Sequence, residues 1–166
     1  MMKYAVLTIS DRCFAGEATD EAGPALCKVM EASLGATQVV VAIVADEADA
    51  IAGRLTEWAS MDDPPDVILT TGGTGLGPRD VTPEATRSAL DRLHPGLMEM
   101  SRSLGAAATP LAYLSRGVAG TIGGTLVINL PGSTTGATDS LRAVVPILDH
   151  AVDSMKGGGH GRPYDE

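Results

Sequence analysis

The residues with the clearest chemical potential lie in a glycine-rich segment near the middle of the chain. Four glycines occur within six residues, Gly72, Gly73, Gly75 and Gly77, and a carboxylate, Asp80, follows them. Glycines in this number let the backbone take positive φ and turn several N–H groups towards one point, which is how a loop binds phosphate oxygens. Because a bare carboxylate repels phosphate, Asp80 and a phosphate can share a site only with a cation between them, and Mg²⁺ is the usual cation.

Two common phosphate-binding motifs do not fit this loop. The Walker pattern requires Gly-Lys-Ser/Thr after its glycines, and no lysine lies between Val29 and Met155. The dinucleotide fingerprint requires a glycine where the chain has Pro78. The alternative to a phosphate site is that the loop is only a tight connection between two elements and that Asp80 is a solvated charge.

The segments on either side of the loop predict how it is held. Residues 67–69 are apolar and bounded by prolines and glycines, which is typical of a short buried strand in a parallel sheet. Beyond the loop, Thr82 is predicted to be the N-cap of a helix with Pro83 at its first position. The predicted order is strand, glycine loop and helix.

The first predicted strand, residues 3–9, ends at a hydroxyl and a carboxylate, Ser10 and Asp11. Ligands bind at the carboxyl ends of strands in open α/β sheets, so both side chains are candidates for substrate contact. The alternative is a solvated loop with an ion pair between Asp11 and Arg12.

The second predicted strand, residues 37–44, is apolar enough to be buried on both faces. Asp46 follows it, and Ile51 and Leu55 recur at helical spacing, so Asp46 is predicted to cap the next helix. Asp46 also lies at the carboxyl end of a strand, which puts it on the same rim of the sheet as the glycine loop.

A further predicted strand, residues 125–129, leads into a second loop of glycine and hydroxyl residues, Pro131, Gly132 and Ser133. A helix follows this loop, so its backbone donors and the helix N-terminus suit an anion. Pro146 interrupts the helical pattern, which predicts a kink or two consecutive helices.

Other helices are predicted over residues 23–34, 83–93 and 97–107, with a break at residues 94–96. The alternation of strands and helices predicts an α/β fold, a three-layer doubly wound and mostly parallel sheet with helices on both faces. We expect one domain over residues 1–156 and a flexible tail over residues 157–166.

Composition limits the classes of partner and compartment. The chain has 166 residues, a net charge of −9, 44% hydrophobic and 3% aromatic residues, so its core must consist of aliphatic side chains. The negative charge argues against nucleic acid and anionic membranes as partners. Two cysteines, Cys13 and Cys27, indicate neither a disulfide framework nor a zinc site. Without an 18-residue apolar run or a signal-peptide pattern, a cytoplasmic protein is expected.

Five segments resemble one known family. The run Thr70-Thr71-Gly72-Gly73-Thr74-Gly75, followed by Pro78-Arg79-Asp80-Val81-Thr82-Pro83-Glu84-Ala85-Thr86, closely resembles the signature of the MogA/MoaB family of molybdenum-cofactor biosynthesis proteins, to which a domain of gephyrin belongs. Matching patches elsewhere are Ser10-Asp11, Asp46-Glu47, Ser115-Arg116 and Asn129-Leu130-Pro131-Gly132-Ser133. The resemblance thus extends over nearly the whole chain.

The resemblance implies an activity and a set of site residues. Catalytic members of the family adenylylate molybdopterin: its terminal phosphate attacks the α-phosphorus of ATP and pyrophosphate leaves. By residue, it implies that Asp46 and Asp80 act in catalysis and, with Mg²⁺ as cofactor, hold the metal. The implied substrate contacts are Ser10, Asp11, Thr71, Gly72, Gly73, Thr74, Gly75, Ser115, Arg116, Pro131, Gly132 and Ser133. The implied partners are molybdopterin, ATP, further copies in a homotrimer and the downstream molybdenum-inserting protein.

Two alternatives to the transferase stay open. One is a MoaB-like relative that binds molybdopterin without transferring an adenylyl group. The other is an unrelated nucleotide-binding enzyme on a similar sheet, which the absence of the common fingerprints disfavours. The segment 79–83 keeps the acidic residue in the setting of the catalytic members, which favours the transferase.

Overall fold

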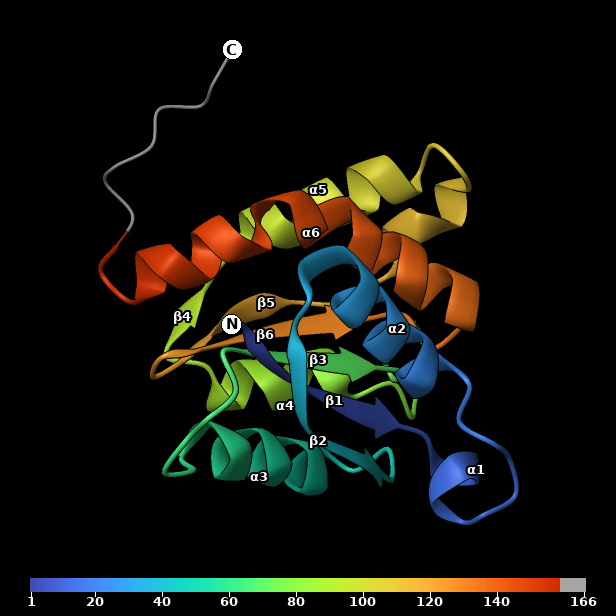
Figure 1. The fold of residues 1–166 in the computed structure, drawn as a ribbon. Helices are drawn as coiled ribbons and strands as arrows, with labels where there is room; N and C mark the ends of the chain where they lie inside the picture. The colour runs from blue at the N-terminus through green and yellow to red at the C-terminus, as the bar shows by residue number, and fades with distance from the viewer. Residues whose placement is uncertain (159–166) are drawn as a thin grey trace.

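The computed structural model describes residues 1–158, which form a six-stranded sheet with helices on both faces (Figure 1). The strand order is β2-β1-β3-β6-β5-β4, and all neighbours pair in parallel except β5, which is antiparallel to both β6 and β4. The predicted three-layer, mostly parallel α/β fold is confirmed. The predicted tail, residues 157–166, lies outside the described residues except for Gly157 and Gly158.

The boundaries of the elements follow the hydrophobic patterning. The strands are β1 (Lys3–Ile9), β2 (Thr37–Val44), β3 (Val67–Thr71), β4 (Arg92–Leu93), β5 (Ala119–Ile122) and β6 (Thr125–Leu130). The helices are α1 (Asp11–Phe14), α2 (Ala22–Leu34), α3 (Ala48–Ala59), α4 (Thr82–Ala89), α5 (Pro95–Gly105), the 3-10 helix η1 (Pro110–Leu114) and α6 (Thr134–Met155). Within residues 1–158, no helix combines the length and the apolar character that crossing a membrane requires.

The central strands end at one level, which determines where a site can form. Thr8 of β1 pairs with Thr71 of β3, and Thr71 pairs with Leu130 of β6. The chain leaves β1 towards β2 on one side and returns to β3 on the other, so the strand order reverses between β1 and β3. In doubly wound sheets this reversal opens a crevice outside the carboxyl ends of the strands.

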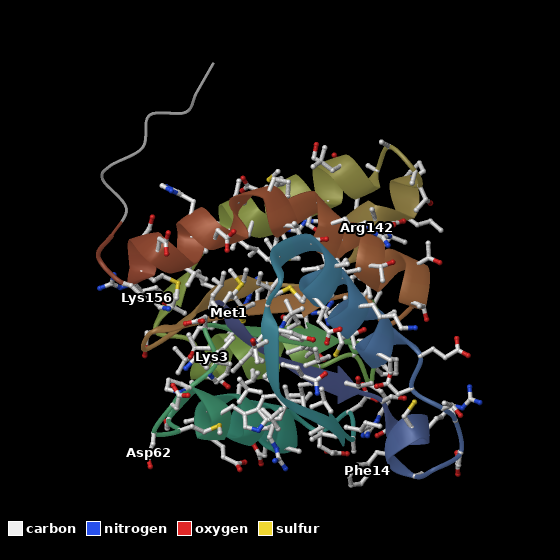
Figure 2. All side chains as sticks on the ribbon, viewed as in Figure 1. Met1, Lys3, Phe14, Asp62, Arg142 and Lys156 are labelled. Carbon is white, nitrogen blue, oxygen red and sulfur yellow. The ribbon has the colours of Figure 1, made fainter. Side chains whose placement is uncertain are left out.

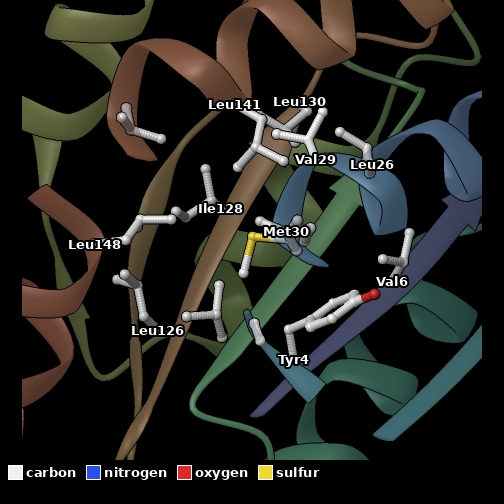
Figure 3. Close-up of a cluster of buried hydrophobic side chains, with 14 of the residues drawn as sticks. Tyr4, Val6, Leu26, Val29, Met30, Leu126, Ile128, Leu130, Leu141 and Leu148 are labelled. Carbon is white, nitrogen blue, oxygen red and sulfur yellow. The ribbon is translucent and has the colours of Figure 1, made fainter. Parts of the chain in front are cut away.

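Two hydrophobic clusters hold the helices against the sheet. On one face, Tyr4 and Ile128 of the sheet and Met30 of α2 are fully buried in a cluster to which α5 and α6 also contribute (Figure 3). On the other face, α3 and α4 cover the sheet, and Trp58 of α3 is 2% exposed. Burial of such side chains contributes about 1.5–3 kcal/mol each, so both faces stabilise the central strands.

The prediction that residues 37–44 are buried on both faces is wrong. β2 is an edge strand, and Val39, Val41 and Ile43 are 37%, 51% and 37% exposed. These alternate side chains lie on one face of the strand, whereas Val40 and Ala42 pack against the other cluster. An apolar run shows that a strand has side chains suited to burial. Whether they are buried depends on the position of the strand in the sheet.

Two helix predictions also need correction. The helix predicted over residues 83–93 ends at Ala89, and Arg92–Leu93 forms the short strand β4 because it pairs with β5. Of the two outcomes predicted at Pro146, a division into two helices is wrong, since α6 runs continuously from Thr134 to Met155, and the kink stays a prediction. The α6 residues Val144 and Leu148 are fully buried, and this packing offsets the hydrogen bond that a proline cannot donate.

The amino ends of the strands are closed by a buried carboxylate, Asp66. It accepts a hydrogen bond from the backbone N–H of Lys3 at 2.7 Å, and the ammonium group of Lys156 lies 2.7 Å from its other oxygen. This links the start of β1, the start of β3 and the end of α6. Lys3 and Lys156 lie away from Phe14, which follows the carboxyl end of β1 (Figure 2).

A buried polar network ties the central strands to α4. The Asn129 amide donates to the hydroxyls of Thr70 and Thr86, both at 3.0 Å, and its oxygen accepts the Val118 N–H at 3.2 Å. Asn129 is fully buried, so its partners would have no water to replace it.

Replacing Asn129 by alanine should lower the free energy of unfolding by about 2–4 kcal/mol, because several buried polar groups lose their partner at once. Urea denaturation measures the change. Thr125→Val is the matched control, since the Thr125 hydroxyl makes one buried bond, to the Pro65 carbonyl at 2.7 Å, and its loss should cost about 1 kcal/mol. Equal losses in the two variants would contradict the network.

Candidate active site

The glycine loop after β3 passes so close to the end of β1 that no side chain fits at its first position. Gly72 has φ +104°, and a Cβ there would collide with the carbonyl oxygen of Ile9. Its N–H donates to the Leu130 carbonyl at 3.2 Å, which attaches the loop to β6 as well. A larger residue would be strained in this conformation and would also separate the strands, so the site requires glycine here.

The second loop, after β6, lies directly against the first. A Cβ at Gly132 would lie 3.2 Å from the Gly72 Cα atom, and the Thr71 hydroxyl donates to the Pro131 carbonyl at 2.6 Å. At the start of α6, the Ser133 hydroxyl accepts the Gly136 N–H at 3.2 Å and acts as the N-cap. The two predicted loops therefore form one surface.

This surface has unused hydrogen-bond donors. Within residues 1–158, the N–H groups of Gly73, Thr74, Gly75, Gly132 and Ser133 have no protein acceptor. Groups of this kind at a helix N-terminus and in a glycine loop attract anions, because the donors and the helix dipole act together.

Two carboxylates lie beside these donors. Asp80 accepts the Gly77 N–H at 2.7 Å through Oδ2, and Asp46 accepts the Asp11 N–H at 2.8 Å through Oδ2. Asp46 and Asp80 each keep a second oxygen that receives no hydrogen bond in the described part of the chain. The Asp46 Oδ1 atom lies 3.1 Å from the position a Cβ would take at Gly73, so this carboxylate borders the glycine loop.

The predictions that Asp46 and Thr82 cap helices are wrong, and both side chains contact the loops of the site instead. Glu47, not Asp46, precedes the first residue of α3, and Asp46 exchanges hydrogen bonds with Asp11 instead. Val81, not Thr82, is the N-cap position of α4, and the buried Thr82 hydroxyl donates to the Gly72 carbonyl at 2.9 Å. Both side chains hold the loops together rather than ending a helix.

A two-armed cleft opens over the loops. One cavity of about 640 Å³ extends towards α5 and η1, and a second of about 410 Å³ extends towards the end of β1 and β2. Both are lined by Gly73, Asp80, Gly132 and Ser133, so the arms meet at the two glycine loops and Asp80.

Most of the predicted site residues line one arm or the other. The larger arm contains Thr74, Gly75, Ser115 and Pro131. The smaller arm contains Ser10, Thr71, Gly72 and Asp46. The structure thus gathers residues from five separate segments of the chain: four lie at the carboxyl ends of β1, β2, β3 and β6, and Ser115 follows η1.

Two predicted contact residues lie elsewhere. Arg116 is outside the lining of both arms, because its guanidinium contacts the Gly75 and Asp80 carbonyls and Glu84. Asp11 is also outside both linings, and its ion pair is with Arg79 at 2.9 Å rather than with Arg12. These two side chains contact the protein where substrate contacts were expected.

The structure adds residues that sequence reasoning missed. Asp20 lines the smaller arm, where it accepts the Thr8 hydroxyl at 2.6 Å and the Gly23 N–H at 3.0 Å. An aspartate three residues before a predicted helical glycine was the available signal, since this spacing is typical of a capping residue. Arg102 of α5 lines the larger arm and has no comparable local pattern.

The pKa values of the neighbouring carboxyls of Asp46 and Asp11 are shifted in opposite directions. Burial raises the pKa of the Asp46 carboxyl, and the negative charges of Asp11 and Asp80 add to this effect. The hydrogen bond from the Asp46 backbone, together with Arg79, lowers the pKa of Asp11. Ionisation is therefore less favourable for Asp46 than for Asp11, and a cation near Asp46 would favour its ionised form.

The donor set fits a magnesium ion that is shared with a ligand. Within residues 1–158, no group of three or more His, Cys, Asp or Glu side chains is placed to hold a metal alone. Proteins usually bind Mg²⁺ through one or two carboxylates, with water and substrate phosphates completing the shell. The free oxygens of Asp46 and Asp80 beside phosphate-binding loops match that pattern.

These features define a class of protein, a doubly wound α/β domain with an anion-binding cleft at the switch point of its sheet. The model of the probable molybdopterin-binding domain family matches residues 5–150. The chain belongs to this family, the MoaB/MogA family of molybdenum cofactor biosynthesis.

Relatives of similar length agree with the fold and the family. A protein of Helicobacter pylori named molybdopterin adenylyltransferase is 38% identical over 92% of this chain and 86% of its own. The crystal structure of MoaB from Thermus thermophilus has a TM-score of 0.88 and 46% identity, and the match covers 99% of this chain and 100% of that one.

Some relatives are much longer than this chain. It matches the molybdenum cofactor synthesis protein cinnamon of Drosophila melanogaster at 42% identity, over 90% of this chain but 25% of that protein. It matches a molybdenum cofactor biosynthesis bifunctional protein of Chlorobaculum tepidum at 38% identity, over 95% of this chain and 50% of that protein. The chain thus spans half or less of the length of these two relatives.

The raised pKa of Asp46 predicts how its removal changes stability with pH. Between the ordinary pKa and the raised one, the folded state binds more protons than the unfolded state, so stability falls as pH rises through that interval. Asp46→Asn can keep the hydrogen bond from Asp11 and removes this cost. The variant should be more stable than wild type at pH 7 in EDTA, and the difference should shrink as the pH falls.

Urea denaturation at pH 7 and pH 4 measures this difference. Asp62→Asn is a control for general charge effects, because Asp62 is an exposed turn residue (Figure 2). A less stable Asp46→Asn variant at pH 7 would show that the ionised carboxylate makes a net favourable contribution.

Proposed function

We propose that this protein is a molybdopterin adenylyltransferase, which transfers AMP from Mg-ATP to the terminal phosphate of molybdopterin. An oxygen of that phosphate forms a bond to the α-phosphorus of ATP, and the bond from this phosphorus to the bridging oxygen breaks, which releases pyrophosphate. The relative of Helicobacter pylori that is named for this activity supports the proposal, since it matches 92% of the chain.

The observation that carries the proposal is the meeting point of the two arms. A transferase must hold two substrates with their reacting phosphates in contact and in line. Here the arms share Asp80, Gly73, Gly132 and Ser133. The shared groups are an anion-binding surface with a carboxylate beside it, which is what a transfer between two phosphates needs.

The reaction needs no general base from the protein. A phosphate monoester with a second pKa of about 6 is mostly dianionic at neutral pH, so the nucleophile is already deprotonated. The histidines agree with this, because His94 and His150 lie outside the lining of both arms. His160 lies outside the described residues.

The protein's task is then to position two anions and to neutralise their charge. The free N–H groups of Gly73, Thr74 and Gly75, and those of Gly132 and Ser133, would donate to phosphate oxygens as fixed dipoles. These donors lie in the loops directly after β3 and β6, and Ser133 is the N-cap of α6, so the sheet and this helix fix where the loops begin.

Asp46 and Asp80 would hold the magnesium ion through the oxygens that receive no protein hydrogen bond. A bound Mg²⁺ supplies positive charge to the triphosphate and to the leaving pyrophosphate. Ionisation of Asp46 would be favoured by the cation, which opposes the effect of burial on its pKa. The proposal further includes a homotrimer, a cytoplasmic location and transfer of the product to a molybdenum-inserting protein.

A second candidate function is binding of molybdopterin without adenylyl transfer. Two relatives bear names that do not mention adenylyl transfer: a Staphylococcus aureus protein named molybdenum cofactor biosynthesis protein B is 36% identical over 93% of this chain, and the Thermus structure is of the molybdopterin biosynthesis enzyme MoaB. The Asp80 carboxylate at the meeting point of the arms favours the transferase over a binding protein.

Incubation with molybdopterin, ATP and Mg²⁺, followed by measurement of pyrophosphate, tests the proposal. Wild type should release pyrophosphate in proportion to the molybdopterin added. Asp80→Asn and Asp46→Asn should keep the fold and bind molybdopterin within about twofold, but lose about 100-fold or more in kcat, since each removes a charged metal ligand.

Asp62→Asn serves again as the control and should keep wild-type rates. Binding of molybdopterin without pyrophosphate release by wild type would support the binding protein instead. Full activity of both Asp46→Asn and Asp80→Asn would overturn the assignment of the metal ligands.

A further inference from the structure

The loop that carries Asp80 has little support of its own. Residues 75–80 form no helix or strand, and residues 76–79 are exposed. Inside the loop there are two hydrogen bonds, from the Asp80 N–H to the Gly77 carbonyl at 3.0 Å and from the Gly77 N–H to the Asp80 carboxylate at 2.7 Å. These bonds fix the shape of the turn but not its position on the protein.

Arg116 attaches the inner side of this loop to the chain leading into β5. Its Nε donates to the Gly75 carbonyl at 2.7 Å, and its Nη2 donates to the Asp80 carbonyl at 2.6 Å. The Arg116 backbone N–H also donates to the Thr74 carbonyl at 2.9 Å. Glu84, in the first turn of α4, pairs with the same guanidinium, and this ion pair fixes the orientation of the Arg116 side chain.

Arg79 attaches the outer side of the loop to the ends of β1 and β2. Its Nε and Nη2 donate to the two carboxylate oxygens of Asp11 at 3.1 and 3.0 Å, and Nη2 lies 2.9 Å from Glu47. Asp11 in turn exchanges hydrogen bonds with the backbone and carboxylate of Asp46. The segments of Asp46 and Asp80 are therefore connected through Arg79.

From these contacts we propose that Arg79 and Arg116 are positioning residues for Asp80, and that neither is a ligand of the substrate phosphates. Both lie outside the lining of the two arms, and their guanidinium groups contact protein oxygens on either side of the loop. The inference rests on the proposed function, because it assigns how Asp80 is held for that reaction.

Arginine suits this role better than lysine because of its shape. A guanidinium presents its donors in a rigid plane, so one side chain can bond two carbonyls and a carboxylate at once. A lysine keeps the charge but has a single ammonium group on a flexible stem, so it cannot hold both Gly75 and Asp80 in the same geometry. Arg→Lys variants at positions 79 and 116 therefore keep the positive charge but lose the geometry that holds the loop with Asp80.

The first test uses the protein without substrate or metal. Hydrogen–deuterium exchange of the peptide that covers residues 75–81 should be about tenfold faster in Arg116→Lys and in Arg79→Lys than in wild type, since the loop opens more often. Glu84→Gln, which leaves both carbonyl bonds of Arg116, should change exchange less than Arg116→Lys. Arg54→Lys is the control, because Arg54 pairs with Glu57 on α3.

The second test separates positioning from phosphate binding. In the pyrophosphate assay, Arg116→Lys and Arg79→Lys should lower kcat by about 10- to 100-fold, the size expected when a reacting group is displaced by about 1 Å. KM for ATP and for molybdopterin should stay within about twofold. Arg54→Lys should behave as wild type in both assays.

The outcomes distinguish this inference from the proposed function. A rise in KM for either substrate with kcat preserved, or unchanged exchange in the 75–81 peptide, would overturn the positioning role. Absence of pyrophosphate release by wild type would refute the transferase but not the exchange result. Circular dichroism of each variant confirms that the fold is intact, and the milder Glu84→Gln keeps the test valid if Arg116→Lys unfolds.

Discussion

The site depends on the close approach of three backbones where β1, β3 and β6 end. Gly72 touches the carbonyl of Ile9 on one side and Gly132 on the other, with no side chain between them. Because the strands end at one level, this contact brings two glycine loops, a helix N-terminus and Asp80 to one point. A methyl group at Gly72 would separate these parts, so the cleft can form only if residue 72 has no side chain.

The second organising feature is the balance of charge around the cleft. An anionic ligand approaches a chain of net charge −9, and the carboxylates nearest the loops would repel it. The structure leaves Asp46 and Asp80 a free oxygen each, and it pairs Asp11 with Arg79 and Glu84 with Arg116. Local donors and a shared cation can then outweigh the distant charge, because screening limits that charge to about 8 Å.

Much of this arrangement could be predicted from the sequence, and the failures have physical causes. Strands β1, β2, β3 and β6, the two glycine loops and the rim that carries Asp46 and Asp80 follow from local patterns of apolar and turn residues, whereas the short antiparallel strands β4 and β5 were not predicted. The exposed face of β2 does not, because its exposure depends on the order of strands. The partner of Asp46 lies 35 residues away in the sequence, and the contacts of Arg116 span 36 residues to Asp80; no local spacing encodes either.

The buried carboxylate of Asp66 has a consequence for how this unit can be built into larger proteins. By joining Lys3 to Lys156, it keeps the beginning of the first strand and the last turn of the final helix together, on the side opposite the cleft. Chain that precedes Lys3 or follows Lys156 would therefore begin on that side, away from the cleft. This geometry suits a unit that forms part of a longer chain, and the match to cinnamon covers a quarter of the length of that protein.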